Sequence, residues 1–313
     1  MNAGETCRSC RLRWEESRVS DYGVSHGACR VDVFAFLQLL ARLEARRCLK
    51  DIEPRLFAED EGPRHGDVEP WRDLYLCVSG KTELLYHLLC RCVLPEAAGG
   101  LEVDALFVDT DYSLDMLRLV SILDSRLSSA GLEEAALRSS LSRLLVVHCS
   151  SSSQLLLTLH YLETTLNSRP SLALLLIDSI SAFYWLDRCE GGASISRQEE
   201  KLSKCAELLG RLLRDYKFTI FATCHTIRRS CSGLAASRSS TLEADRPYLC
   251  RPWQRLVTHR VLCSRQEAEN HTAGGSREEK RQVFRVHCSS SSSRTKASRI
   301  SSFCVTDAGV QFI

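Results

Sequence analysis

Runs of hydrophobic residues alternate with amphipathic stretches through the middle of the chain. The hydrophobic runs are short and continuous, and they cover residues 74–78, 105–108, 143–148, 172–177 and 218–223. The stretches between them repeat an apolar residue every three or four positions, and they cover residues 84–89, 114–127, 154–166 and 197–216. Continuous apolar strands separated by helices are typical of a sheet that is buried on both faces. The pattern therefore predicts an α/β fold, with a mostly parallel sheet and helices on both of its faces.

The N-terminal end of the chain and two internal segments lack this alternation. Residues 1–35 are polar, are rich in arginine and glutamate and show no period, so we interpret them as a flexible lead to a core of residues 36–313. Residues 228–246 are rich in serine and arginine, and residues 264–298 contain polar low-complexity stretches with five consecutive serines. We interpret both as insertions into the core.

Further elements are predicted on either side of the alternating part. An apolar stripe predicts a helix over 33–43, and the acidic stretch 59–66, which contains glycine and proline, predicts a loop. A second apolar run predicts a strand over 256–263. Residues 303–305 and 310–312 flank a short turn, a pattern typical of a β-hairpin that closes the core.

Composition limits what this fold can do. A content of 44% hydrophobic and 26% charged residues excludes a fully disordered chain. The net charge of +2 excludes a basic field over the whole molecule, so any nucleic-acid surface must be local. No hydrophobic run is long enough to span a membrane and no secretory signal is recognisable, so we expect no membrane partner.

The chain contains 16 cysteines at irregular spacing. Cys7 and Cys10 form half of a zinc site, and His26 with Cys29 could complete it. We favour the alternative that the cysteines are reduced thiols of an intracellular protein, many of them acting as small hydrophobic residues of the core.

Gly80, Lys81 and Thr82 lie between the predicted strand over 74–78 and the predicted helix over 84–89. Backbone N–H groups at a helix N-terminus favour anions, so this position suits the phosphates of a nucleotide. Lys81 would then contact the β- and γ-phosphates, and the Thr82 hydroxyl would bind Mg²⁺. The alternative is a chance Gly-Lys-Thr triplet at the start of a helix.

The residues before Gly80 lack the glycines of a phosphate loop. Tyr75 stands where the motif requires its first glycine, and Leu76, Cys77 and Val78 occupy the turn that small residues normally form. A β-branched residue such as Val78 is costly in a left-handed conformation. The segment therefore either wraps around a phosphate as a degenerate loop or stays extended.

Acidic residues follow two of the predicted strands directly. Asp178 ends one buried strand, and Asp109 and Asp111 follow another. Ligand sites of parallel sheets lie at the carboxyl ends of strands, so we expect these carboxylates at the same edge as Lys81. An aspartate in the place of Asp178 supports Mg²⁺ in P-loop NTPases. The alternative is an aspartate that caps a turn at the end of a strand.

These motifs occur in a fixed order: GKTE at 80–83, LFVDTD at 106–111, LLLIDSISAFYW at 174–185 and FTIFATCHT at 218–226. The order resembles the core of the eukaryotic RecA-type recombinases. Further phrases are similar to one group of that family, the recombinase paralogues, at residues 39–44, 52–54, 65–67, 81–87, 99–102, 109–112, 115–120, 179–185 and 245–250. The resemblance covers roughly residues 39–313 and does not include residues 1–35 and 68–79.

The resemblance implies a RecA-like P-loop NTPase core that binds ATP and Mg²⁺. At the matching positions, the resemblance implies that the nucleotide is bound by Ser79, Gly80, Lys81, Thr82, Glu83, Asp178 and His225. It implies that the metal is bound by Thr82 and Asp178. Asp111 is the catalytic candidate, because it stands where catalytic recombinases carry a glutamate that orients the attacking water. Its side chain is one methylene shorter, which predicts weak hydrolysis. His225 stands where these enzymes carry a glutamine, and the alternative is a polar loop residue.

Two segments correspond in this resemblance to loops that face single-stranded DNA, residues 185–196 and residues 228–246. The second contains the DNA-binding candidates Arg228, Arg229 and Arg238, since arginines follow the phosphates of a single strand. Aromatic residues are not interleaved with them, so base stacking is not indicated. The alternative is a plain surface loop.

The function that the resemblance implies is DNA repair by homologous recombination in the nucleus, with the cytoplasm as a second location. The chain would work in a hetero-oligomer of recombinase paralogues on single-stranded or branched DNA, and it would assist recombinase loading. Whether it hydrolyses ATP is left open. One alternative is a nucleotide-independent scaffold of the same complex with a degenerate P-loop. A second alternative, a small-molecule P-loop kinase, would need an arginine-bearing lid and an acceptor pocket, and the sequence indicates neither.

Overall fold

The computed structural model describes residues 52–57, 81–216, 218–224, 226–227, 246–247, 250–266, 282–290 and 298–313. Some predictions fall outside this part of the chain: the N-terminal lead, the helix over 33–43, the strand over 74–78, and the site candidates Ser79, Gly80, His225, Arg228, Arg229 and Arg238. They stay predictions.

Four parallel strands form the first sheet, in the order β2-β1-β3-β4. Their bounds are Asp104–Asp109 for β1, Leu144–His148 for β2, Leu172–Asp178 for β3 and Thr219–Ala222 for β4. Every residue of β1 and β3 is buried, as expected for strands that are covered on both faces. The sheet confirms four of the predicted strands and the α/β fold class.

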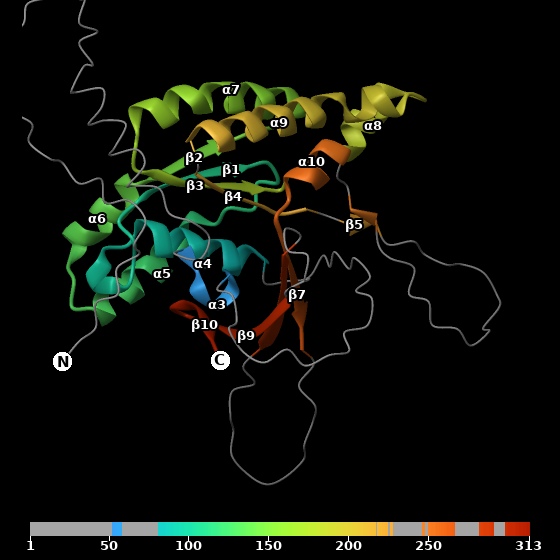
Figure 1. The fold of residues 1–313 in the computed structure, drawn as a ribbon. Coiled ribbons are helices and arrows are strands. Elements are labelled where there is room, and N and C mark those ends of the chain that lie inside the picture. Colours follow the sequence, from blue (N-terminus) through green and yellow to red (C-terminus); the bar gives the residue numbers. More distant parts are fainter. Residues whose placement is uncertain are drawn as a thin grey trace, which may run out of the picture.

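Helices cover both faces of this sheet (Figure 1). One face carries α4 (Lys81–Val93), α5 (Met116–Ser129) and α6 (Glu134–Ser142), and the other carries α7 (Ser152–Ser168) and α9 (Ile195–Tyr216). Successive side chains of β1 pack on opposite faces of the sheet. Phe107 packs with α4 and α5, whereas Leu106 and Val108 pack with α7 and α9. None of the helices in the described ranges is both long and apolar enough to cross a membrane.

Capping side chains set where two of these helices begin. The side chain of Asp115 accepts a hydrogen bond from the N–H of Arg118 at 3.0 Å, and that of Ser151 accepts one from the N–H of Gln154 at 3.2 Å. Each cap satisfies a backbone donor that has no partner inside the helix. The predicted helices over 114–127 and 154–166 therefore begin at Met116 and Ser152.

A second, antiparallel sheet contains the C-terminal part of the chain, in the order β10-β9-β8-β7. Its strands are β7 (His259–Arg265), β8 (Val283–Ser290), β9 (Ser298–Thr306) and β10 (Gly309–Phe312). The pair β9–β10 confirms the predicted hairpin, whose turn ends at Gly309 with φ +86°. The strand predicted over 256–263 begins later, at His259, because the helix α10 (Arg251–Leu256) precedes it.

Part of the stretch that composition indicated as an insertion, residues 264–298, is a strand of this sheet. In β8 the side chains of Phe284, Val286 and Cys288 are buried, whereas Arg285 is exposed. This period of two fits a strand, and β8 pairs with both β7 and β9. The ends of the other predicted insertion lie together, because β5 (Thr226–Ile227) pairs with β6 (Arg246–Pro247).

The described cysteines are mostly parts of the core, as we expected. The buried ones are Cys90, Cys92, Cys149, Cys205, Cys250, Cys263, Cys288 and Cys304. Burial raises the pKa of the thiols of Cys90, Cys92 and Cys205 to about 12. These thiols are protonated at neutral pH and act as small hydrophobic residues.

A buried hydrogen bond between His87 and Glu53 joins the start of the short helix α3 (Pro54–Phe57) to the core. Nε2 of His87 lies 2.5 Å from Oε2 of Glu53. Nη2 of Arg126 donates to Nδ1 of the same ring at 3.2 Å, so the ring proton is on Nε2. Nε of Arg126 also donates to the carbonyl of Ala308 at 3.0 Å. The network therefore ties α3, α4 and α5 to the turn between β9 and β10.

Acidification is expected to destabilise the protein through this pair. Burial lowers the pKa of His87 below its usual 6.5. Burial is the largest single influence and raises the pKa of Glu53, but the hydrogen bond and electrostatic attraction of His87, the backbone N–H of Arg55 and the charge of Arg91 together hold that pKa below 4.5. The unfolded state therefore binds more protons than the folded state, first as pH falls below about 6.5 and again below about 4.5. Thermal unfolding should show a Tm that falls as the pH is lowered from 7.5 to 4.5.

His87→Gln is the variant that assigns this effect. The amide can keep a hydrogen bond to Glu53 but cannot take up a proton. In this variant the free energy of unfolding should fall less steeply with decreasing pH between 6.5 and 5, and the slope should differ from that of the natural protein by at most about 1.4 kcal/mol per pH unit. A dependence that is as steep in the variant as in the natural protein would contradict the assignment to His87.

Candidate functional site

The carboxyl ends of β1 and β3 bring two of the predicted acidic residues together. Asp109 and Asp178 are opposite residues of these neighbouring strands. Their side chains belong to residues that are only 1% and 8% exposed. The structure therefore confirms that the strands carrying the predicted carboxylates are neighbours. Carboxylates that are buried to this extent need hydrogen-bond donors nearby.

The turn after β1 and the end of β4 supply these donors. The backbone N–H groups of Ser113 and Leu114 donate to Asp109 at 3.1 and 3.3 Å, so Asp109 closes the turn. The hydroxyl of Ser113 donates to Oδ2 of Asp178 at 2.8 Å, and the hydroxyl of Thr223 donates to Oδ1. Both oxygens of Asp178 are thus oriented by hydroxyl groups that the sequence did not indicate. The only signal for them was position: Thr223 is the last residue of the predicted strand over 218–223, and Ser113 directly precedes the predicted helix over 114–127.

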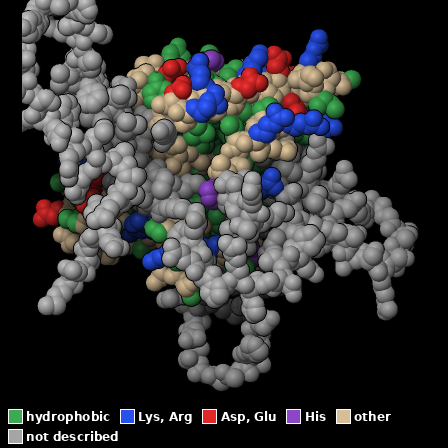
Figure 2. Space-filling model, viewed as in Figure 1, with side chains coloured by type: hydrophobic (Ala, Val, Ile, Leu, Met, Phe, Trp, Pro, Cys, Tyr) green, Lys and Arg blue, Asp and Glu red, His purple; other side chains and the backbone are tan. Residues whose placement is uncertain are grey.

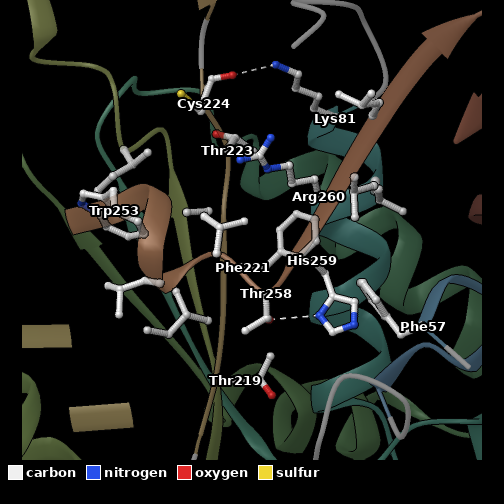
Figure 3. A pocket seen from close by; sticks show the side chains of 18 of the residues that line it. Phe57, Lys81, Thr219, Phe221, Thr223, Cys224, Trp253, Thr258, His259 and Arg260 are labelled. Carbon is white, nitrogen blue, oxygen red and sulfur yellow. Dashed lines mark hydrogen bonds between the residues drawn. The ribbon is translucent and has the colours of Figure 1, made fainter. Parts of the chain in front are cut away.

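Lys81 and Thr82 begin α4 at the same edge of the sheet. Nζ of Lys81 donates to the carbonyl of Cys224 at 3.1 Å, just beyond the end of β4 (Figure 3). Cys224 follows Thr223, whose hydroxyl donates to Asp178. The ammonium group of Lys81 and the carboxylate of Asp178 therefore lie at the same edge of the parallel sheet. The hydroxyl of Thr82 has no hydrogen-bond partner among the residues that the structure describes.

Glu83 and Asp111 are placed differently from these residues. Arg118 donates two hydrogen bonds to the carboxylate of Glu83 at 3.0 and 3.1 Å, and a third to the carbonyl of Thr306 at 2.7 Å. Glu83 therefore joins α4 to α5 and β9. Asp111 is exposed, and its backbone N–H donates to the carbonyl of Asp178 at 3.3 Å. Asp111 thus lies beside Asp178, and its nucleotide-related role stays a prediction.

The donor set at this edge is compatible with a magnesium–nucleotide complex. It comprises an ammonium group and a hydroxyl at the start of a 13-residue helix, and an oriented carboxylate. Across the described ranges, no three or more His, Cys, Asp and Glu side chains are arranged to hold a metal ion. A Mg²⁺ ion here would therefore depend on Thr82, Asp178, phosphate oxygens and water, which is the way proteins commonly bind it.

A cavity of about 340 Å³ lies beside this edge, between the two sheets. Its walls come from α4, β4, α10 and β7 (Figure 3). Lys81 lies at the same end as Cys224, whereas Trp253 and Phe57 lie on opposite sides of the space. Apolar residues form most of the lining, so its main part suits a hydrophobic occupant.

The prediction of a loop over 185–196 is wrong for most of its length, because residues 184–191 form the helix α8 (Tyr184–Gly191), and contact of this segment with DNA stays a prediction. Asp187 anchors this helix to α7, since its carboxylate is buried and accepts a hydrogen bond from the Ser152 hydroxyl at 2.7 Å. Trp185 is 55% exposed, and the guanidinium of Arg188 lies 5.7 Å from the centre of its ring. The helix therefore presents an aromatic residue and a cation at the surface.

Positive and negative side chains are mixed over α7, α8 and α9 on the face seen in Figure 2. Ion pairs account for much of this mixture: Lys201–Glu190, Lys204–Glu200 and Arg211–Glu163. The described part of this face carries no broad basic field. Any binding of DNA therefore depends on local groups, as the net charge indicated.

Comparison with known proteins agrees with this architecture. The model of the Rad51 family matches residues 75–245. The chain is 50% identical over 236 residues to the DNA repair protein XRCC2 of Mus musculus, which is 74% of this chain and 84% of that protein. It is 26% identical over 243 residues to the DNA repair protein XRCC2 homolog of Arabidopsis thaliana, 59% of this chain and 65% of that protein. Because the matched segment also contains Lys81, Asp109 and Asp178 at one edge of a parallel sheet, the chain belongs to the Rad51 family of RecA-type recombinases and their paralogues.

Proposed function

We propose that this chain is a repair factor of homologous recombination that works in a hetero-oligomer of recombinase paralogues. Membership of the Rad51 family supports the role in recombination, and two relatives named for DNA repair support the role in repair. In this proposal the chain acts in the nucleus on single-stranded or branched DNA and assists loading of the main recombinase. The observation that carries it is the placement of Lys81, Thr82 and Asp178 at one edge of the family's sheet.

Association with other recombinase paralogues is the first test of this proposal. A tagged full-length chain expressed in cells should copurify with at least one other Rad51-family chain, and nuclease treatment should not release it. A variant with the exposed Leu157 of α7 changed to a charged residue shows whether that face contributes to the contact. Repeated purification without any Rad51-family chain would contradict the proposed complex.

The nucleotide site of this factor would hold ATP and Mg²⁺ weakly. Lys81 would contact the phosphates, and Thr82 and Asp178 would hold the metal, while ATP supplies the phosphoryl group. Tyr75 and Val78 stand where a phosphate loop turns, and their Cβ atoms oppose the left-handed conformations required there. We therefore expect weak binding and weaker hydrolysis.

The contact between Lys81 and Cys224 favours a second candidate function, a nucleotide-independent scaffold of the same complex. The carbonyl of Cys224 accepts a hydrogen bond from the ammonium group, so the lysine is satisfied without a phosphate. Glu83 is likewise paired, with Arg118. A scaffold would keep its partners and its repair activity when Lys81 is replaced.

Replacement of both Arg228 and Arg229 by alanine is expected to weaken binding to single-stranded DNA. Each lost phosphate contact lowers the slope of log K against log salt concentration by about 0.7, so the slope should fall by about 1.4. Fluorescence anisotropy at several salt concentrations measures both quantities. Arg138→Ala, which removes an exposed arginine of α6 paired with Glu134, is the matched control and should change neither. An unchanged slope in the double variant would show that this segment does not touch DNA.

A further inference from the structure

The turn between β1 and α5 has a backbone that the core holds in place. The carboxylate of Asp109 accepts hydrogen bonds from the N–H groups of Ser113 and Leu114 at 3.1 and 3.3 Å. The hydroxyl of Tyr86, a residue that is only 2% exposed, accepts a hydrogen bond from the N–H of Asp115 at 2.7 Å. Side chains that this turn presents to solvent therefore have fixed positions, and fixed positions reduce the entropy that is lost when a partner binds.

Tyr112 presents an aromatic ring at the surface of this turn. Its φ is +53°, a left-handed conformation that is unfavourable for a residue with a bulky side chain. The ring stacks on that of His148, with the centroids 5.7 Å apart and an angle of 4° between the two planes. Nδ1 of His148 lies 3.3 Å from Oδ2 of Asp109, which holds the imidazole in place. Tyr112 is nevertheless 67% exposed, so the face of its ring that lies away from His148 is open to a partner.

Two further apolar side chains are exposed close to Tyr112 along the chain, in the first turn of α5. Met116 is 41% exposed, and Leu117 is 84% exposed, the largest value among the large hydrophobic side chains that the structure describes. Exposed apolar side chains that gather in one place mark a surface for a partner, whereas single ones are common. We call Tyr112, Met116 and Leu117 together the Tyr112 surface.

The charge around the Tyr112 surface is negative. Residues 109–117 contain three aspartates and neither lysine nor arginine. Asp111 and Asp115 are exposed, and they lie on either side of Tyr112 in the sequence. The next residue, Arg118, is turned away, because its guanidinium binds a carboxylate of α4 and two carbonyls at the turn between β9 and β10. The surface therefore complements a positively charged partner.

We infer that the Tyr112 surface is a docking site for a segment of another protein in which an arginine lies next to an apolar side chain. The guanidinium stacks on the open face of the Tyr112 ring, because the face of an aromatic ring attracts cations. The carboxylates of Asp111 and Asp115 pair with the same guanidinium, and Leu117 packs against the apolar neighbour. Arginine suits this place better than lysine, because its planar group can stack on a ring and bind a carboxylate at the same time.

A protein segment is a better occupant of this surface than a nucleic acid. Carboxylates repel the phosphates of DNA and RNA, and the Tyr112 surface has no lysine or arginine of its own to offset them. The inference goes beyond the proposed function, because it is argued from the residues of this surface alone and holds whether or not the chain acts in repair.

Titration of the purified full-length protein with the peptide Gly-Leu-Arg-Leu-Gly tests this inference. NMR spectra should show shifts at the amides of residues 111–118 and of His148. The same peptide with citrulline, which has nearly the shape of arginine but no charge, should bind at least about fivefold more weakly. Equal affinity for the two peptides, or shifts confined to other parts of the chain, would overturn the inference.

Two variants assign the binding to named side chains. Tyr112→Gly removes the ring, and glycine adopts a φ of +53° readily, so the turn keeps its conformation. Asp115→Asn removes a charge and keeps the cap of α5, because asparagine caps helices as well as aspartate does. Each should keep a Tm close to that of the natural protein and bind the arginine peptide at least about threefold more weakly.

Tyr161→Ala is the matched control for these variants, because it removes a similarly exposed tyrosine from α7. It should leave the affinity for the arginine peptide unchanged. Tyr112→Phe keeps an aromatic ring and should bind the peptide about as tightly as the natural protein does. An affinity that Tyr112→Gly leaves unchanged, or that Tyr161→Ala lowers as much, would contradict the inference.

Photo-cross-linking in cells tests whether the occupant is another protein. Benzoylphenylalanine in place of Leu117 should form a cross-link to a different chain, and the same group in place of Ile300, an exposed residue of β9, should not form it. In a cell extract the arginine peptide at millimolar concentration should lower this cross-link at least about threefold, whereas the citrulline peptide should not. Cross-links that join two copies of this chain or lie within one copy would overturn the inference, and so would the absence of any cross-link.

Discussion

Replacement of Phe107 by alanine is expected to lower the free energy of unfolding by about 3–5 kcal/mol. Phe107 is fully buried in β1 and packs against α4 and α5. β1 lies between β2 and β3, so the cavity left by the ring has close-packed neighbours that can fill it only partly. The loss corresponds to a fall in Tm of roughly 6–20 °C, which circular dichroism or calorimetry can measure.

Tyr161→Ala is the matched control for this prediction. It also removes an aromatic ring, but from the outer side of α7, where Tyr161 is 71% exposed. Its free energy of unfolding should stay within about 0.5 kcal/mol of that of the natural protein. Equal losses in the two variants would contradict the place of Phe107 at the centre of the core.

The purified chain is expected to bind Mg-ATP about 10- to 1000-fold more weakly than a P-loop protein with the full set of glycines. Residues with a Cβ atom at left-handed positions cost about 1–2 kcal/mol each, and two such residues account for this range. Titration calorimetry in the presence of Mg²⁺ measures the Kd.

Lys81→Ala distinguishes a weak nucleotide site from a functional one. Lys204→Ala, which removes an exposed lysine of α9, is the matched control. For a weak site, Lys81→Ala should change repair activity in cells as little as Lys204→Ala does. Micromolar binding of Mg-ATP that Lys81→Ala abolishes and Lys204→Ala preserves would contradict the weak site and favour a nucleotide-dependent switch.

The parallel sheet could be predicted because strands that are buried on both faces leave a strong sequence pattern. Leu106 and Phe107 point to opposite faces of the sheet, yet both are apolar, and the helices beside them repeat apolar residues on one side. The approach of Asp109 to Asp178 followed from the rule that ligand sites lie where parallel strands end.

The antiparallel sheet and the helix α8 were harder to predict. The strand β8 alternates buried Phe284, Val286 and Cys288 with outward residues, but its serine-rich surroundings indicated an insertion. In the segment of α8, the resemblance to recombinases implied a loop, whereas the contact of Asp187 with α7 holds a helix. For β8, the composition of the surrounding sequence predicted the structure less well than the alternation of buried and outward residues did.

The hydrogen bonds of the candidate site could not be predicted from local sequence. Ser113 and Asp178 are 65 positions apart, and Lys81 and Cys224 are 143 positions apart. Such contacts depend on how strands and helices pack, and no nearby residue signals them. Serine and threonine at strand ends are common, so Ser113 and Thr223 carried no pattern of their own.

A break-repair reporter in cells that lack this chain tests the central claim, that the chain is a repair factor of homologous recombination. The reporter scores only repair of a double-strand break from a homologous template. Removal of the chain should lower this repair several-fold, and the natural chain should restore it. Phe107→Ala should fail to restore it, because the variant is unstable, and Tyr161→Ala should restore it. Reporter activity that is unchanged when the chain is removed would contradict the account.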